Sequence, residues 1–547
     1  MGAAVGEVTA GTGRAAAGIA AAATMIALIT VASRVFGFGR NIVLLFTVGP
    51  TALGDVYNAA AAIPNIIFEI VAGGALAGLV VPLLAKPLAE GDRETVRKTA
   101  SSLLTWTMLI LTPLAILQAV FASPIMNVLG TANAPQHAAG VTMLRVFAPM
   151  VLFYGVGIVL TGVLQAHRKF AWPALAPLLS SVTVMASYVI FALVAGTKPD
   201  LATVSKGEVL ILAVGTALAA AVLSGCLLIP VHRLGVKLRP RLEFSDAQRK
   251  LVAGLAAAGL VTIGVQQIAR LVTIRLSLAA NDGTQVVFST AQAMFLLPWA
   301  VLAVPLATAS YPAIATAHAT GEVAQRNATV AKTGRGVVLL GCLGAALLTA
   351  VAYPLAGLLI RQDPMQAQWL GAATMAFAPG LYGYSVSALH QRTLYAAGAQ
   401  RFAAVAIGLG WTVTIAASVI FSRVFAEPDR AMALGAANSV GMTVLGGALA
   451  FGVWRKCGAE ALKGVGKVTF AGVGAATVAI ASALLLESAI DEARPGVWEL
   501  IWQGTVSAVT AAVVFAGMAL LLDREDSRAA WKKLRGWRTR AGKGGTP

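Results

Sequence analysis

The fold is indicated by a stretch that occurs twice in the chain, as FAPMVLFYGVGIVLTGVLQA at residues 147–166 and as FAPGLYGYSVSALHQRTLYA at residues 377–396. Seven positions are identical at a constant offset of 230, starting with Phe-Ala-Pro in each copy. Each copy is mostly apolar over about 20 residues, the length that a helix needs to cross a bilayer. The sequence therefore predicts a membrane-spanning unit that is repeated once.

The composition indicates that the rest of the chain is also embedded in a membrane. Of the 547 residues, 58% are hydrophobic and only 12% are charged. That balance does not fit a soluble protein of this length. The apolar runs are long and continuous rather than alternating, so we predict transmembrane helices and exclude a transmembrane barrel.

A window of about 19 residues gives fourteen predicted spans. We predict an all-α polytopic membrane protein in which two six-helix lobes form a parallel repeat and two C-terminal helices follow. Six is an even number, so both lobes keep the same orientation across the membrane. The predicted spans lie near residues 18–47, 56–84, 99–124, 138–165, 172–195, 207–231, 251–276, 284–315, 333–360, 369–397, 402–422, 431–454, 468–487 and 498–522.

Lys and Arg concentrate on one side of the predicted membrane. With the N-terminus inside, 28 of the 41 basic residues fall in cytoplasmic segments, six fall outside and seven lie within spans. Cytoplasmic loops carry such an excess in membrane proteins, so we predict that both termini are cytoplasmic. We attribute the formal net charge of +18 to this topology and not to nucleic-acid binding.

These patterns together predict the domain organisation. The segments are a cytoplasmic N-terminal tail (1–17), an N-lobe (18–231), a basic cytoplasmic linker (232–250), a C-lobe (251–455), the last two helices (456–522) and a basic cytoplasmic tail (523–547).

Polar side chains form stripes along four predicted spans. At 100° per residue, each stripe covers a sector of about 60–80° of its helix. The first two spans and the seventh and eighth are equivalent under the repeat, so we expect the stripes to face each other across a water-filled cavity. The stripes contain Ser33, Gly37, Arg40 and Thr47; Asp55, Asn58, Asn65 and Glu69; Thr262, Gln266, Arg270, Thr273 and Ser277; and Gln285, Ser289 and Gln292.

Charged residues inside spans are functional candidates because each costs about 2.5–3.5 kcal/mol in hydrocarbon. Four arginines against two acids give the cavity a charge of +2, which favours an anionic substrate. Arginine suits phosphate because its planar guanidinium can bind two oxygens at once. The candidate substrate-binding residues are Arg34, Arg40, Asp55, Glu69, Gln266, Arg270 and Arg275, and the candidate gating residues are Gly37, Pro64, Pro82 and Pro298.

Structural alternatives exist for these charged residues. Asp55 and Arg275 lie near span ends, where the alternative is contact with lipid headgroups. For Glu69 the alternative is a structural ion pair with an arginine of span one. For Arg40 and Arg270 the alternative is a structural pair with a residue of another helix.

Two other polar segments have simpler interpretations. We interpret His390-Gln391-Arg392 as an interfacial anchor, with a proton relay as the alternative. The tail from Asp523 to Arg540 predicts an interfacial helix on anionic lipid, with a disordered tail as the alternative.

Catalysis has no residues to carry it in this sequence. Three distant cysteines exclude a disulfide framework and a thiolate zinc site. We find no Ser/His/Asp arrangement, metal-ligand spacing or phosphate-binding loop. The sequence therefore predicts a transporter and not an enzyme, without cofactor or metal, and leaves a coupling ion or the membrane potential open as the driving force.

Several motifs resemble those of the MurJ (MviN-type) lipid II flippases of the MOP exporter superfamily. SRVFGFGR at 33–40 is similar to the family's S-R-x-x-G-x-x-R. GVLQAHRKFAWPALAP at 162–177 is similar to its G-x-L-x-A-x-x-x-F-x-x-P-A-L-A-P, the most specific match. Asp55, Ile63-Pro64-Asn65 and the segment from Gly74 to Pro82 add to the resemblance, which covers spans one to twelve and, we expect, all fourteen.

The resemblance implies a bacterial inner-membrane flippase that moves lipid II, the lipid-linked peptidoglycan precursor, from the inner to the outer leaflet by alternating access. It implies a groove for the polyprenyl tail beside the last two helices, and it implies essential positions at Arg34, Arg40 and Asp55. We expect a monomer in membrane lipid that binds no nucleic acid, with the cell-wall synthesis machinery as a candidate partner.

Four places depart from the family's pattern. Phe68-Glu69 stand where an arginine pair is usual, and Gln292-Ala293 replace an Asp-Arg pair. Asn41 replaces an acidic residue, and Thr273 replaces the aspartate linked to sodium in some members. We expect two arginines of span seven to replace the lost positive charge. Sodium coupling and the identity of the headgroup stay open.

Three other functions are compatible with parts of the sequence. One is a flippase for another polyprenyl-diphosphate-linked glycan. Another is a cation-coupled multidrug antiporter, which would need acidic residues in the cavity and is disfavoured by the arginines. The last is a scaffold of envelope assembly, which would not need charged stripes.

Overall fold

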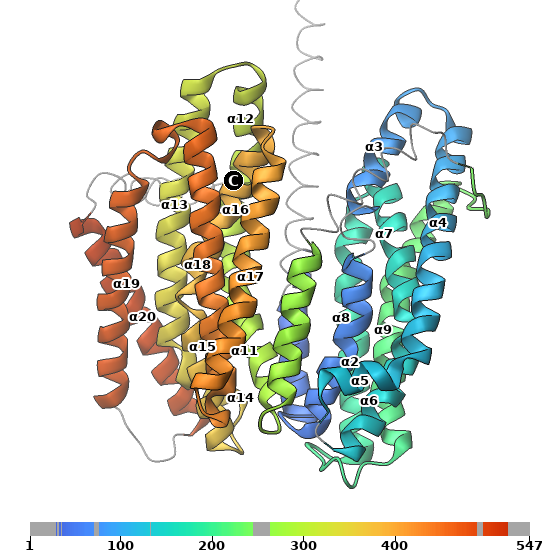
Figure 1. Cartoon of the computed structure of the whole chain (residues 1–547), viewed down its shortest axis with the longest axis horizontal. Coiled ribbons are helices and arrows are strands. Elements are labelled where there is room, and N and C mark those ends of the chain that lie inside the picture. Colours follow the sequence, from blue (N-terminus) through green and yellow to red (C-terminus); the bar gives the residue numbers. More distant parts are fainter. Residues whose placement is uncertain are drawn as a thin grey trace, which may run out of the picture. The chain divides into compact units, whose positions relative to one another are not determined.

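The structure is a computed structural model of the whole chain. It describes residues 29, 32–33, 35–70, 76–131, 133–243, 263–489 and 496–522. Every regular element of these residues is a helix (Figure 1). The chain forms two compact units that divide between Gln267 and Ile268.

The first unit consists of helical residues 35–47 and eight further helices. Helical residues 263–278 cross the boundary into the second unit. The eight helices are α2 (Ala52–Phe68), α3 (Leu76–Ala89), α4 (Arg93–Val120), α5 (Ala122–Leu129), α6 (Ala134–Phe147), α7 (Met150–Ala166), α8 (Ala171–Ala195) and α9 (Lys206–Arg233).

The second unit has the same order of helices and then two more. Its elements are α11 (Thr284–Pro298), the π-helical turn η2 (Trp299–Ala303), α12 (Val304–Ala319), α13 (Val323–Ala350), α14 (Ala352–Leu359), α15 (Pro364–Phe377), α16 (Gly380–Ala396), α17 (Gln400–Val424), the short turn η3 (Glu427–Asp429), α18 (Arg430–Cys457), the short turn η4 (Ala459–Leu462), α19 (Val465–Ala489) and α20 (Val497–Leu522).

The helix boundaries repeat with the offset found in the sequence. α4 and α13 are both 28 residues long and start at Arg93 and Val323. α5 and α14 are both eight residues long and start at Ala122 and Ala352. The prediction of an all-α membrane protein made of a repeated six-helix unit and two C-terminal helices is therefore confirmed.

Proline explains the break that divides both copies of the repeated stretch. In the first unit α6 ends at Phe147 and α7 begins at Met150. In the second unit the same break separates α15 from α16. Pro149 and Pro379 lie in these breaks and have no backbone N–H, so the helical hydrogen-bond ladder is interrupted at both places. The fourth and tenth predicted spans are consequently each made of two helices.

A left-handed glycine closes the equivalent turn in both units. Gly91 has a φ of +72° and Gly321 a φ of +75°, a conformation that strains any residue with a Cβ. The residue after each glycine donates its N–H to a carbonyl of the preceding helix. Asp92 donates to the Pro87 carbonyl at 2.9 Å, and Glu322 donates to the Ala317 carbonyl at 2.8 Å. The turn fixes where α4 and α13 begin.

Ten helical segments among the described residues are long and apolar enough to cross a membrane. They correspond to the third to sixth, eighth, ninth and eleventh to fourteenth predicted spans. The first and seventh spans lie partly outside the described residues, and the second is interrupted by undescribed residues 71–75. The tenth is divided into α15 and α16, which are 14 and 17 residues long. Every predicted span contains a described helix.

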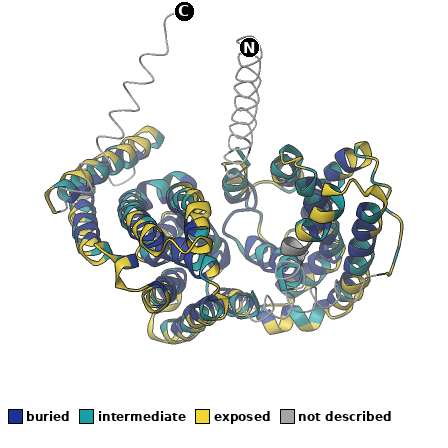
Figure 2. Ribbon diagram, turned by 90° about the horizontal axis from the view of Figure 1, so that it is seen from above, coloured by how far each residue is buried: buried dark blue, intermediate teal, exposed yellow. Residues whose placement is uncertain are grey.

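Large apolar side chains lie exposed on the outer helices, as contact with lipid requires. Leu193 is 80% exposed, Phe470 85% and Trp498 81%. Figure 2 shows exposed residues along the outer faces of the helices and buried residues between them. In water such surfaces would drive aggregation, whereas in hydrocarbon they need no cover.

Two glycines let the backbones of α16 and α18 touch. A Cβ on Gly446 would lie 2.4 Å from the Gly383 carbonyl oxygen, and a Cβ on Gly383 would lie 2.3 Å from the Met442 carbonyl oxygen. Small residues at such crossings are the usual means of close packing between membrane helices. A Cβ on the neighbouring Gly447 would have no atom within 4 Å.

We predict that Gly446→Ala lowers the thermal unfolding temperature of the purified protein. The added methyl group must push two helix backbones apart, and overpacking of this kind costs about 1–3 kcal/mol. Gly447→Ala, the matched control, should leave the unfolding temperature unchanged or raise it slightly, because alanine favours a helix more than glycine does. Equal unfolding temperatures for the two variants would contradict the proposed contact.

Candidate functional site

The first-unit candidates lie on helical residues 35–47 and on α2. Arg34 lies outside the described residues. Arg40 is exposed, whereas Asp55 is only 2% exposed. Glu69 is half-buried and accepts a hydrogen bond from the Gln267 side chain, which belongs to the same unit. One arginine of the predicted stripe thus reaches the surface of its unit, whereas Asp55 is buried and Glu69 is half-buried.

The start of α2 is set by a cap that also places Asp55. The Thr51 hydroxyl accepts a hydrogen bond from the Gly54 N–H at 3.2 Å and so begins the helix. Asp55 then falls in the first turn, where the helix dipole favours a negative charge. Farther along the stripe, the Asn65 side chain donates to the Ala61 carbonyl of its own helix at 2.9 Å. Asn65 is therefore satisfied locally.

The second group of candidates lies on helical residues 263–278. Arg270 and Arg275 are exposed, and Gln266 is half-buried. Ser277 is fully buried and donates a hydrogen bond to Gln285 of α11. This contact joins the polar stripes of the seventh and eighth predicted spans.

Thr273 occupies the place where some family members have an acidic residue. Its hydroxyl donates to the Ala269 carbonyl at 2.8 Å, and its side chain is 8% exposed. A threonine bound to its own helix cannot replace a carboxylate charge.

The candidate gating residues differ in their surroundings. Pro64 is buried inside α2, and Pro82 is exposed on α3. Pro298 is the last residue of α11 and leads directly into the π-helical turn η2. Gly37 has open space where a Cβ would be. Their role in gating stays a prediction.

A π-helical irregularity occurs at the same place in both units. It covers residues 69–70 after α2 and Trp299–Ala303 after α11, so both segments begin at equivalent positions of the repeat. Such bulges are frequent at functional sites. In the second unit the Trp299 ring stacks on Tyr384 with 4.6 Å between ring centroids. In the first unit Glu69 takes the place of that tryptophan.

A chain of hydroxyl groups on three helices was not predicted from the sequence. The Tyr57 hydroxyl of α2 lies 2.7 Å from the Tyr188 hydroxyl of α8 and 2.7 Å from the Thr216 hydroxyl of α9. All three side chains are buried. The signal available in the sequence was the presence of tyrosine within apolar spans, since a buried tyrosine hydroxyl usually has a partner. Which partner it has depends on how the helices pack.

The interpretation of His390 as an interfacial anchor was wrong. An interfacial anchor would be exposed, but His390 is 1% exposed, and neither ring nitrogen has a hydrogen-bond partner among the described residues. The rest of the cluster bonds locally, with Gln391 donating to the Tyr395 hydroxyl at 2.9 Å and Arg392 to the Ala388 carbonyl at 2.6 Å.

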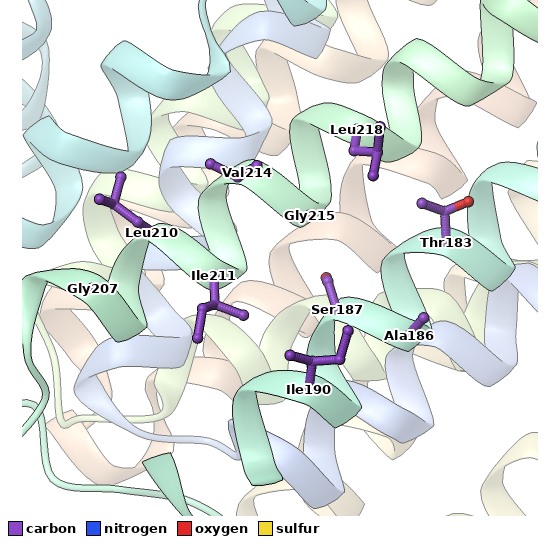
Figure 3. Close-up of a pocket in the computed structure, with 10 residues that line it drawn as sticks. All are labelled: Thr183, Ala186, Ser187, Ile190, Gly207, Leu210, Ile211, Val214, Gly215 and Leu218. Carbon is purple, nitrogen blue, oxygen red and sulfur yellow. The ribbon is translucent and has the colours of Figure 1, made fainter. Parts of the chain in front are cut away.

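A pocket of about 470 Å³ lies between α8 and α9 (Figure 3). Its two hydroxyl-bearing side chains donate to their own helix, Thr183 to the Leu179 carbonyl and Ser187 to the Val184 carbonyl. No charged residue lines this pocket, so it fits hydrocarbon and not a phosphate group. The lining residues are Thr183, Ala186, Ser187, Ile190, Gly207, Leu210, Ile211, Val214, Gly215 and Leu218.

Across the part of the chain that the structure describes, no three His, Cys, Asp or Glu side chains are grouped to hold a metal ion. A repeated six-helix membrane unit with charged residues inside its spans defines a transporter of the repeat-built class.

The comparisons with known proteins identify the family. Residues 45–497 match the family model described as lipid II flippase MurJ. This match covers most of the chain, which therefore belongs to the lipid II flippase MurJ family. The lipid II flippase MurJ of Burkholderia cenocepacia is 24% identical over 367 residues, which are 64% of this chain and 67% of that protein.

Solved structures of two related kinds share the fold. A lipid II flippase MurJ in an inward closed conformation has a TM-score of 0.72 at 16% identity, over 92% of this chain and 99% of that one. An inward-facing multidrug resistance MATE family transporter of the MOP superfamily has a TM-score of 0.64 at 15% identity, over 79% of this chain and 98% of that one. Family and fold together make this chain a multi-pass transporter of the bacterial inner membrane and not an enzyme.

Proposed function

We propose that this protein moves lipid II, the polyprenyl-diphosphate-linked peptidoglycan precursor, from the inner to the outer leaflet of the bacterial cytoplasmic membrane by alternating access. The observation that carries the proposal is the family match over residues 45–497. The charged residues within its spans support it independently, because a diphosphate needs cationic groups at membrane depth.

In this proposal Arg40 and Arg270 bind the diphosphate. Both residues are exposed in their units. Guanidinium groups bind phosphate oxygens with charge-assisted, often bidentate hydrogen bonds. Arg34, Asp55, Glu69, Gln266 and Arg275 complete the proposed site and set its charge.

The gating role also remains part of the proposal. We infer that Gly37 and Pro64, Pro82 and Pro298 let their helices bend when the protein changes between inward-open and outward-open states. A proline inside a helix removes one backbone hydrogen bond, which lowers the resistance of the helix to bending.

We propose that both termini are cytoplasmic and that the domain boundaries follow the predicted ones. The C-terminal end of α18 supports this orientation, because exposed Trp454 lies beside exposed Arg455 and Lys456. Aromatic side chains mark both membrane interfaces, and an excess of basic side chains is typical of the cytoplasmic one. α19 and α20 would then flank the polyprenyl tail, which must stay in lipid during transport.

The nearest competing function is a flippase for another polyprenyl-diphosphate-linked glycan. It is supported by the departures from the family's usual residues, since Glu69 and Gln292 both stand where a different charge is common. The diphosphate site would be the same in both cases. Only the recognition of the sugar and peptide headgroup would differ.

We predict that Arg40→Ala and Arg270→Ala each lower the transport rate by about one to two orders of magnitude. The loss follows from removing hydrogen bonds to a charged group, each worth about 1.5–3 kcal/mol. The measurement is flipping of fluorescent lipid II in proteoliposomes, with membrane insertion checked for each variant. Arg423→Ala, an exposed arginine near the end of α17, is the matched control and should transport normally. Normal transport by both site variants would remove the proposed role of these residues.

Depletion of the protein from its own bacterium distinguishes the two flippase functions. We expect lipid II to accumulate in the inner leaflet, because its synthesis continues while its export stops. The measurement is mass spectrometry of lipid-linked precursors after depletion. Accumulation of a different polyprenyl-linked glycan would support the competing flippase. Normal precursor levels together with normal peptidoglycan synthesis would refute both.

A further inference from the structure

A segment without regular structure follows α9 and is fixed to the side of α4 (Figure 1). It consists of residues 234–243 and is called the α4 strap below. Backbone groups of the strap meet polar side chains of α4 at four points, so this part of the predicted linker belongs to the first unit. The Arg239 N–H donates to the Ser101 hydroxyl at 3.1 Å, the Arg241 N–H to the Thr105 hydroxyl at 2.9 Å, the Trp106 indole to the Leu242 carbonyl at 3.0 Å, and the Ser102 hydroxyl to the Glu243 carbonyl at 2.7 Å.

Side chains alternate along the α4 strap between the protein interior and its surface. Leu234, Val236 and Leu238 are half-buried and pack on the apolar core of α3, α4, α7 and α9. Lys237 and Arg239, which come between and after them, are exposed. A period of two is expected of an extended chain that is covered on one face. The strap therefore presents its basic side chains outward because its apolar side chains are held inward.

The surface of α4 shows at what depth in the membrane the strap lies. The first turns of the helix expose Arg93 and Lys98, which need water. Farther along, Leu109 is 52% exposed and Ile110 is 47% exposed, as contact with hydrocarbon requires. The strap is bound between these two regions and reaches Trp106, a residue type that is enriched at membrane interfaces. The strap thus lies at the level of the lipid headgroups.

The two outward basic residues of the strap have their charges available. Within the described part of the chain, no acidic side chain forms an ion pair with Lys237 or Arg239. Other basic residues near the strap are neutralised by acids of their own segment. These pairs are Arg97 and Lys98 with Glu94, at 2.7 and 3.5 Å, and Arg241 with Glu243, at 2.9 Å.

We propose that the α4 strap binds the headgroups of anionic phospholipids through Lys237 and Arg239. Lipid phosphates lie at the same depth, and their oxygens accept charge-assisted hydrogen bonds from ammonium and guanidinium groups. On the deeper side of the strap, Leu242 is 56% exposed beside Trp106, so the same surface also meets acyl chains. A membrane lipid fits this combination of basic and apolar groups, whereas an acidic protein segment fits the basic groups alone.

Crosslinking to lipids of known charge tests the proposal. The full chain is placed in phosphatidylcholine nanodiscs with a small fraction of photoreactive phosphatidylglycerol or photoreactive phosphatidylcholine, each with its reactive group on the acyl chain next to the headgroup. Mass spectrometry then measures crosslinks to α4 around Leu109 and Ile110. We expect the anionic lipid to be preferred severalfold by the wild type. Lys237→Gln and Arg239→Gln should each lower that preference by up to about fivefold, the attraction that one basic residue adds at an anionic surface.

A second variant tests whether the strap positions these charges. Ser101→Ala combined with Thr105→Val removes the hydroxyl acceptors of the Arg239 and Arg241 N–H groups and changes no charge. Amide hydrogen exchange at positions 239 and 241 should become faster in this variant. The preference for phosphatidylglycerol should fall as well, because Lys237 and Arg239 are then no longer held over α4.

Two matched controls come from the same unit. Thr183→Val removes a hydroxyl that donates to the Leu179 carbonyl of its own helix at 2.9 Å. Lys206→Gln removes an exposed lysine at the opposite end of α9 from the strap. Both should leave the lipid preference at α4 and the exchange of the strap unchanged. Thermal unfolding of every variant shows whether it folds.

The outcomes decide the inference without reference to the lipid that is transported. Equal crosslinking of the two photoreactive lipids in the wild type would overturn it. Faster exchange in the hydroxyl variant with an unchanged lipid preference would also overturn it, because the charges would then act without being held. Crosslinking of an acidic protein to the strap in cells, without any lipid preference in nanodiscs, would replace the lipid by a protein partner.

Discussion

The structure depends on one constraint, which is that charged and polar groups inside a bilayer must meet water or a partner. The backbone meets it by forming helices, which leave no amide unpaired in hydrocarbon. Side chains meet it in two ways in this chain. Asn65 and Thr273 donate to carbonyls of their own helices, whereas the full charges of Arg40 and Arg270 need water or an anionic group as well. Their exposure within each unit is consistent with contact to water or to an anionic substrate.

The two units share a backbone plan and differ in the chemistry placed on it. Equivalent helices start and end 230 residues apart, and both units have a π-helical segment at the same point. In the second unit this segment carries Trp299, which stacks on Tyr384. In the first unit it carries Glu69, and the equivalent tyrosine, Tyr154, packs against Phe68 with 5.4 Å between ring centroids. The first unit is thus the more polar of the two at this position.

The fold could be predicted from the sequence because its signals are local or periodic. Apolar length located the spans, and Phe147-Ala148-Pro149 with its second copy located both the repeat and the helix breaks. The polar stripes identified Arg40, Asp55 and Arg270 as candidates for the same reason. Helical periodicity states which side chains share a face but does not state what that face contacts. His390 was therefore misjudged, since its burial comes from packing against other helices. The chain of Tyr57, Tyr188 and Thr216 joins residues 131 and 159 positions apart, a distance that no periodic pattern reports.

The central claim is that guanidinium groups at membrane depth are in contact with water and not with lipid. It is tested most directly by cysteine accessibility in a variant without its three native cysteines, Cys226, Cys342 and Cys457. Single cysteines at positions 40 and 270 are treated in intact membranes with a positively charged, water-soluble thiol reagent. A cysteine at Leu193, which is 80% exposed on the outside of α8, reports lipid contact. The account predicts rapid labelling at 40 and 270 and little at 193. Labelling at 40 and 270 no faster than at 193 would contradict it.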